Sequence, residues 1–368
     1  MLVMQMYKAN HSATDDDFFK GVSKHRASLM GLSILSVMLF HQYFTSIPPF
    51  NFFHNYGYWG VDIFLFLSGM GMVSSLQNHT LAEFYKRRCS RILPICIVCG
   101  TLKYITFLLM GTSVASIQEG LHLGWWSVAS LDLWYVNVIL IFYAVSPLLY
   151  KSLNHFRWQT LFIIFVLFCL NGLTLRPKVG HAWMSLEGLT AWSVERLPVF
   201  VLGMLVAMRK DIINKRSIAI STFFLINAIS IVVIAKTFGL KEDTSVIRVL
   251  SVALEMASLV SFCVWALNRT PSIVRKFMAF MGKHSLEIYL VHEFVFTTLM
   301  VLYNKYCHPF VLLGIAFSMS IILAQVCNLV SERWSYLYCF INAIGRKKGK
   351  EVLGNREKGT FKQGGRYV

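Results

Sequence analysis

The chain has 368 residues and a formal net charge of +17; 56% of its residues are hydrophobic and only 14% are charged. Because soluble globular proteins carry about a quarter charged residues, this composition excludes an ordinary soluble domain and indicates an integral membrane protein. In such a protein the excess of lysine and arginine reports topology, so we expect no nucleic-acid partner.

The apolar residues fall in blocks close to the length that a membrane helix needs, about 20 residues. We predict spans at residues 29–47, 59–77, 92–111, 131–149, 159–175, 193–208, 217–235, 247–267, 285–303 and 309–330. The blocks lack the short alternation of barrel strands, so we predict an all-α, polytopic bundle of about ten transmembrane helices.

Lysine and arginine are concentrated in alternate loops and in the C-terminal tail. By the positive-inside rule, both termini then lie in the cytoplasm, and an even number of spans gives the same answer. The predicted organisation is a cytoplasmic N-terminal segment (1–28), a transmembrane domain (29–335) and a basic, disordered cytoplasmic tail (336–368) that touches anionic lipid.

The first span contains His41 near its end and, before it, no ionisable side chain between residues 29 and 40. Ionisable groups at membrane depth are costly, so such a residue is a functional-site candidate. The alternative is a histidine at the helix end that contacts headgroups or water.

Asp62 lies near the start of the second span, beside small residues that allow close helix contact. It is either an N-terminal carboxylate favoured by the helix dipole or a partner for His41. A carboxylate beside an imidazole would fix its tautomer and raise its basicity.

The loop after the second span carries Arg88 and Arg91, which share one face of a helix. They are either topology signals or a site for a phosphorylated donor, since guanidinium groups suit phosphate. Pro94 indicates a helix start, which also favours anions nearby.

The fourth and sixth spans have polar and aromatic residues at their outer ends. Asp132, Trp134 and Asn137 open the fourth span, where they either anchor the helix at the interface or line a sugar site. Glu195 and Arg196 open the sixth, where they pair with each other or face one cavity.

Further ionisable residues lie inside the later spans or near the middle of the third. They are Lys103, Glu255, Glu287, His292 and Glu293. Each is either polar packing within the bundle or part of a substrate path, so a transporter or flippase is an alternative function. The sequence contains no metal-ligand spacing, phosphate loop or dinucleotide fingerprint, so we expect no metal and no permanently bound cofactor.

Six segments, taken together and in order, resemble the membrane acyltransferase family type 3, the bacterial O-acyltransferases that modify surface polysaccharides. The segments are LMGLSILSVMLFH, GYWGVDIFLFLSGM, FYKRRCSRILP, LWYVNVILIFYAVSPLL, ERLPVFVLGMLVA and GKHSLEIYLVHEFVF. The resemblance runs from about residue 26 to residue 335.

The resemblance implies a cytoplasmic acyl-CoA co-substrate, usually acetyl-CoA, and an acceptor hydroxyl on a glycan or lipid-linked sugar. It also implies a place in the bacterial cytoplasmic (inner) membrane and an essential histidine, here His41. Arg88 and Arg91 match the arginine pair of the family, and Asp62 and Trp134 match positions in its outer half. His41 would act as general base or as acyl carrier, and the sequence leaves this choice and the oligomeric state open.

The sequence departs from the family pattern at one position. The family pairs its histidine with an arginine separated by ten residues, and that position is Met30 here. Arg26 lies one turn nearer the cytoplasm and can reach the same region by snorkelling. Either Arg26 replaces the missing arginine or the chain is an inactive member kept as a partner subunit.

Overall fold

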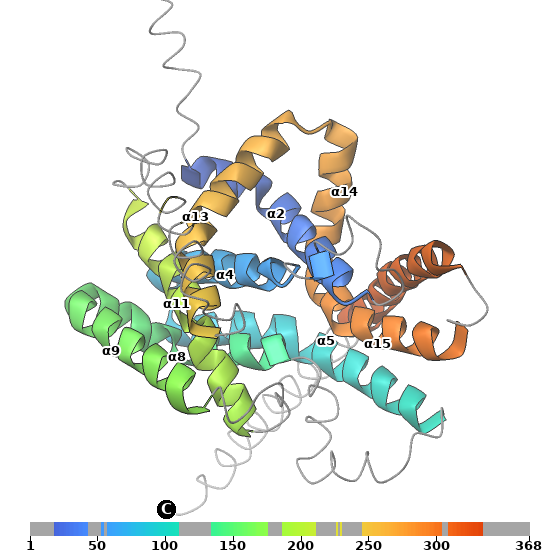
Figure 1. Cartoon of the computed structure of the whole chain (residues 1–368), viewed down its shortest axis with the longest axis horizontal. Coiled ribbons are helices and arrows are strands. Elements are labelled where there is room, and N and C mark those ends of the chain that lie inside the picture. The colour runs from blue at the N-terminus through green and yellow to red at the C-terminus, as the bar shows by residue number, and fades with distance from the viewer. Residues whose placement is uncertain are drawn as a thin grey trace, which may run out of the picture.

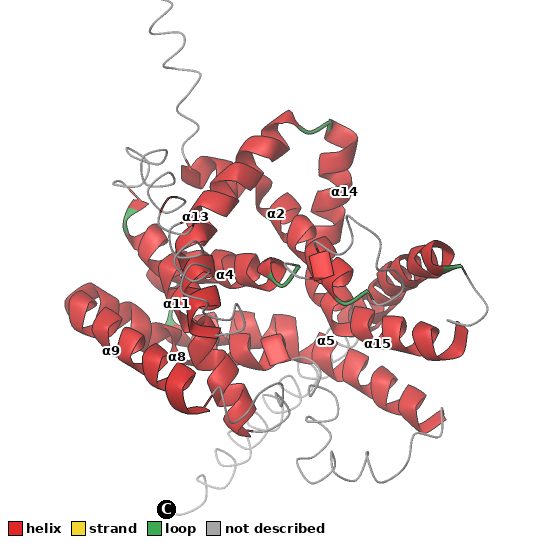
Figure 2. Cartoon of the chain, viewed as in Figure 1, coloured by secondary structure: helices red, strands yellow, loops and turns green. Residues whose placement is uncertain are grey.

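The computed structural model describes residues 18–42, 53–54, 57–109, 134–175, 186–210, 226, 229, 245–303 and 308–333. Within these ranges every regular element is a helix (Figure 2). Five helices there are long and apolar enough to cross a membrane: Trp59–Asn78, Trp134–His155, Arg157–Thr174, Glu187–Met208 and Pro309–Arg333. The predicted all-α membrane fold is thus confirmed, while the count of ten spans and the side of the termini stay predictions.

Helices occupy most of the predicted spans, and Figure 1 shows how they are arranged. Their bounds are α2 Phe18–Phe40, α4 Trp59–Asn78, α5 Leu81–Leu109, α8 Trp134–His155, α9 Arg157–Leu170, the π-helix η1 Asn171–Leu175, α11 Leu186–Met208, α13 Ser245–Arg269, α14 Ser272–Lys283 and α15 Ser285–Tyr303. The predicted span 217–235 lies outside the described residues except for two positions, as do residues 1–17 and the tail 336–368.

Several helices differ from the expectation: α14 has no counterpart among the predicted spans, α11 begins at Leu186 rather than at residue 193, and α2 and α5 begin earlier still. α2 and α5 each begin about three turns earlier than the predicted span, because charged residues on their first turns look like loop in a hydropathy pattern. α5 begins with a capping box in which the Thr80 N–H donates to the Glu83 carboxylate at 3.1 Å. That hydrogen bond lowers the pKa of Glu83, which lies before the span.

Close backbone contacts at glycines set how the central helices pack. A Cβ at Gly69 of α4 would meet the Phe200 carbonyl oxygen of α11, and a Cβ at Gly203 would meet that of Phe66. Without a hydrophobic force between helices in lipid, such small-residue contacts allow the backbones to approach. Asp62 and Arg196, which each precede the glycine of their own helix by two turns, are also in contact, so α4 and α11 run parallel.

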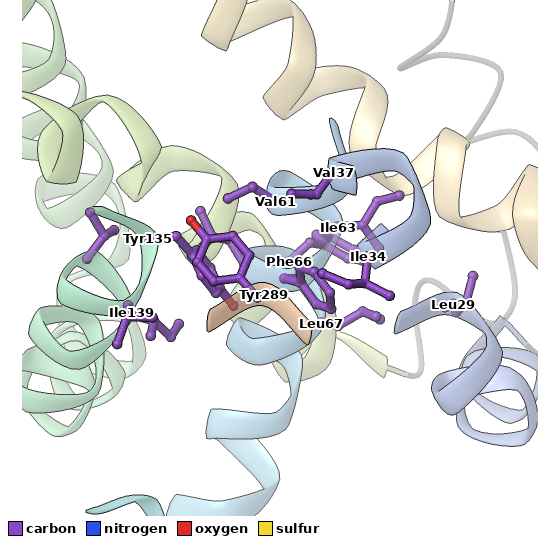
Figure 3. Packing of buried hydrophobic residues seen from close by; sticks show 14 of the residues in the cluster. Leu29, Ile34, Val37, Val61, Ile63, Phe66, Leu67, Tyr135, Ile139 and Tyr289 are labelled. Carbon is purple, nitrogen blue, oxygen red and sulfur yellow. The ribbon is translucent and has the colours of Figure 1, made fainter. Parts of the chain in front are cut away.

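The core of the bundle lies between α2, α4, α8, α11 and α15. Figure 3 shows Ile34 of α2 beside Phe66 of α4, and the rings of Tyr135 and Tyr289, which meet edge to face near Ile139. By contrast α9 leaves large apolar side chains exposed, Trp158 at 77% among them, as suits a lipid-facing helix.

Candidate functional site

Three arginines from two helices line one pocket, which we call the arginine pocket. Arg26 comes from α2, and Arg88 and Arg91 come from α5. The pocket has a volume of about 110 Å³, and no carboxylate lies among its lining residues. The other lining residues are Met30, Phe64, Ser68, Ile92, Tyr135, Ile139, Tyr143, Ser285, Leu286 and Tyr289. A concave site with three cations and no counter-charge in its wall suits an anionic ligand.

Backbone and aromatic contacts, rather than carboxylates, position two of the guanidinium groups. Arg26 Nη2 donates to the Leu67 carbonyl oxygen at 3.0 Å. The Arg88 guanidinium lies 5.3 Å from the ring centre of Tyr143 and 5.8 Å from that of Phe84. Its Nε is buried and has no hydrogen-bond partner within the described part of the chain. These arginines therefore keep donors for a ligand.

Two imidazole rings lie together at the end of α2. His41 follows the last residue of α2, and its ring centre is 5.2 Å from that of His292 on α15. His41 Nδ1 lies 3.8 Å from a carboxylate oxygen of Glu293, the residue after His292. This distance is too long for a direct hydrogen bond, and the contact is an ion pair only when His41 is protonated.

The proton on His292 can be assigned from its neighbours. Nδ1 lies 2.9 Å from the Tyr289 carbonyl oxygen and 3.2 Å from that of Ile288. Carbonyl oxygens only accept hydrogen bonds, so Nδ1 must carry a proton. In the neutral ring Nε2 then holds a lone pair, and this buried atom has no hydrogen-bond partner among the residues described.

Aromatic side chains connect the arginine pocket with the two histidines. Tyr135 and Tyr289 both line the pocket, and their ring centres are 5.1 Å apart (Figure 3). The ring of Tyr289 lies 5.6 Å from that of His292, which in turn contacts His41. A ligand held by the arginines therefore lies only a few side chains away from the imidazole pair.

A buried ion pair joins α4 to α11. Arg196 Nη1 lies 2.8 Å from both carboxylate oxygens of Asp62, and both side chains are almost fully buried. The Arg196 guanidinium also lies 5.7–5.8 Å from the ring centres of Tyr58, Trp134 and Trp192. The carboxylate and the three aromatic rings together hold the guanidinium group in place.

The pairing expected between Asp62 and His41 is corrected by this arrangement: Asp62 pairs with Arg196, and His41 with Glu293. α2 and α4 are indeed neighbours, since a Cβ at Gly60 would meet the Ser33 carbonyl oxygen. Asp62, however, comes two residues later, about 200° around the helix, and so faces α11.

The other predicted site residues that the structure describes lie either beside Arg196 or beside His41. Trp134 packs on Trp192 beside Arg196, with ring centres 4.9 Å apart, and Glu195 is buried next to Arg196. His292, for which the sequence left polar packing and a substrate path open, lies against His41. Asp132 lies outside the described residues.

Three contributors to the site are not predicted by the sequence alone. For Glu293 the sequence leaves polar packing and a substrate path open, and it assigns no role to Tyr289 or Tyr143. The segment YLVHE places Tyr289, His292 and Glu293 at spacings of three and four, which put them on one helix face. That spacing was a usable signal; nothing in the sequence points to Tyr143.

A comparison with family models matches residues 29–329 to a family described as an acyltransferase domain. No curated protein and no solved structure gives a significant match. The matched range contains the arginine pocket's α5 residues, both histidines and the Asp62–Arg196 pair. The chain therefore belongs to the type 3 family of membrane acyltransferases, which the order of its motifs had indicated.

Proposed function

We propose that the protein is an O-acyltransferase of the bacterial cytoplasmic membrane. It moves an acyl group, with acetyl as the first candidate, from cytoplasmic acyl-CoA to a hydroxyl of a cell-surface glycan or its lipid-linked precursor. The observation that supports this proposal most is a series of contacting aromatic rings that leads from the arginine pocket to the two histidines.

The arginine pocket would bind the phosphates of acyl-CoA. Arg88 and Arg91 lie on the loop side that the positive-inside rule assigns to the cytoplasm, where the donor is found. Arg26 and Met30 both line this pocket, so Arg26 would take the place of the arginine that the family has at position 30. This favours an active enzyme over an inactive family member.

His41 would carry the transfer. With Nδ1 turned to Glu293, Nε2 is the nitrogen that remains for chemistry. As general base, it takes the proton of the acceptor hydroxyl while the oxygen attacks the thioester carbonyl; the C–S bond breaks, and the CoA thiolate recovers the proton. As acyl carrier, Nε2 attacks the thioester carbonyl, the C–S bond breaks and CoA leaves as the thiolate; the acceptor hydroxyl then attacks the acyl-imidazole, the C–N bond breaks and the hydroxyl proton passes to the thiolate.

His292 would serve as the second imidazole of the site. Its Nε2 is buried, and its ring contacts that of His41. The lone pair on this nitrogen can accept a hydrogen bond from the acceptor hydroxyl or from protonated His41. Either contact would orient the reacting groups, a role that side chains beside a general base commonly have.

The test is mass spectrometry of surface glycans from cells that carry the wild type, His41→Ala or His155→Ala. His155 is an exposed histidine at the end of α8 and serves as the matched control. We expect O-acylation to disappear only with His41→Ala at equal protein level. Unchanged O-acylation in that variant would remove His41 from the mechanism, and single-turnover trapping of an acyl-protein separates the base from the carrier route.

A further inference from the structure

α14 presents an apolar stripe that no described helix covers. Ile273, Phe277 and Phe280 are 76%, 47% and 38% exposed. They follow one another at spacings of four and three, so they form a single stripe along the helix. The opposite side of α14 packs on α2, where a Cβ at Gly282 would meet the Ala27 carbonyl oxygen.

The orientation of this stripe is held by specific contacts. Arg275 Nη1 donates to the Thr270 carbonyl oxygen at 2.9 Å and to that of Leu267 at 3.4 Å, which ties α14 to the end of α13. The Ser28 hydroxyl of α2 donates to the Arg275 carbonyl oxygen at 3.3 Å. Figure 1 shows α14 beside α2 and joined to α13 by a short connection.

Charge is distributed on α14 in a way that suits one kind of partner. Lys276 and Lys283 are exposed and lie two turns apart along one flank of the apolar stripe. The helix contains no acidic residue. With 12 residues it is about 18 Å long, too short to cross a bilayer. An apolar stripe flanked by lysines on a short helix is the chemistry of an interfacial helix.

We propose that α14 lies in the cytoplasmic surface of the bilayer and binds anionic phospholipid. Ile273, Phe277 and Phe280 enter the boundary between headgroups and acyl chains, and Lys276 and Lys283 contact the phosphates. The loop that contains α14 is on the cytoplasmic side by its positive charge, the leaflet face where anionic lipid attracts basic segments.

This lipid contact would also support the proposed donor site, and this second step rests on the proposed function. α14 ends at Lys283, and Ser285 and Leu286 at the start of α15 already line the arginine pocket. Gly282 packs against the backbone of Ala27, next to Arg26. Lipid bound to α14 would therefore hold one wall of the pocket.

The membrane contact is tested with the full chain in nanodiscs, after removal of the cysteines that react with label. Spin labels are placed at Phe277→Cys and, as the matched neighbour, at Lys276→Cys. We expect the label at 277 to be accessible to oxygen and shielded from a water-soluble nickel chelate, and the label at 276 to show the opposite. If the label at 277 were as accessible to the nickel chelate as the label at 276, α14 would lie in water and the proposal would be overturned.

Lipid selectivity is tested by the phosphatidylglycerol and phosphatidylcholine that copurify from mixed vesicles. We expect the wild type to retain at least about twofold more of the anionic lipid than Lys276→Gln/Lys283→Gln. Lys20→Gln/Lys151→Gln, which removes two exposed lysines elsewhere, should behave as the wild type. Equal retention by the two double variants would overturn the anionic site. Neither readout depends on acyl transfer, so the proposed function can fail separately.

Discussion

At the scale of single residues, the site depends on which atoms remain available once the protein's own contacts are made. Two backbone carbonyls accept from His292 Nδ1, and within the described part of the chain no group donates to the Nε2 lone pair. Glu293 is the carboxylate nearest to His41 Nδ1, at 3.8 Å, and we propose that the other nitrogen, Nε2, meets the substrate. In the arginine pocket, a carbonyl and two aromatic rings position the guanidinium groups without neutralising them.

His292→Asn tests the assigned tautomer. The asparagine amide can still donate where Nδ1 does, toward the Tyr289 and Ile288 carbonyls, but it offers nothing in the place of Nε2. We therefore expect a thermal stability close to that of the wild type and a fall in kcat of about 10²-fold, the usual scale for a lost acid–base partner. A variant that keeps its kcat would show that Nε2 has no part in the reaction.

Arg26→Gln tests whether Arg26 replaces the family arginine missing at Met30. Loss of a charge-assisted hydrogen bond costs about 1.5–3 kcal/mol. We expect the KM for acyl-CoA to rise about 10- to 100-fold with little change in kcat. Adding Met30→Arg to this variant should restore part of the affinity, whereas Lys24→Gln, an exposed neighbour on α2, should have no effect. An unchanged KM in Arg26→Gln would exclude it from donor binding.

At the scale of elements, α4 and α11 form a parallel pair joined by glycine contacts and by one ion pair. Asp62 and Arg196 each lie two turns before the glycine of their own helix, Gly69 and Gly203. The glycines bring the backbones together, and the same register places the carboxylate against the guanidinium. We infer that this pair positions the two helices rather than taking part in the acyl transfer.

Removing one partner of this ion pair should lower the stability of the protein more than removing both partners. Asp62→Asn or Arg196→Met leaves a buried charge without its counter-charge and should cost about 3–5 kcal/mol of stability. The double variant Asp62→Leu/Arg196→Met should recover much of that loss and retain kcat. The measurement is thermal unfolding in detergent together with turnover; a stable double variant without activity would instead give the pair a role in the reaction.

At the scale of the whole molecule, hydropathy and charge predicted the fold class and most of the helices, since a bilayer demands long apolar segments. They missed α14, because a short amphipathic helix with lysines has the composition of a loop. The sequence also placed Arg26, Arg88 and Arg91 on one side of the membrane, which made their shared pocket foreseeable. It could not predict the partner of Asp62, because that depends on which face of α4 meets α11.

We propose that the arginine pocket binds the donor and that His41 carries the transfer, and the rings of Tyr135 and Tyr289 connect the two places. These roles should separate in kinetics, because a residue that binds the donor alters KM whereas one that acts in the transition state alters kcat. The most direct measurement is CoA release by the reconstituted protein, compared with its dissociation constant for acyl-CoA. We predict that His41→Gln abolishes release and leaves donor affinity unchanged, whereas Arg88→Gln/Arg91→Gln weakens affinity. Undiminished CoA release by His41→Gln would contradict the account.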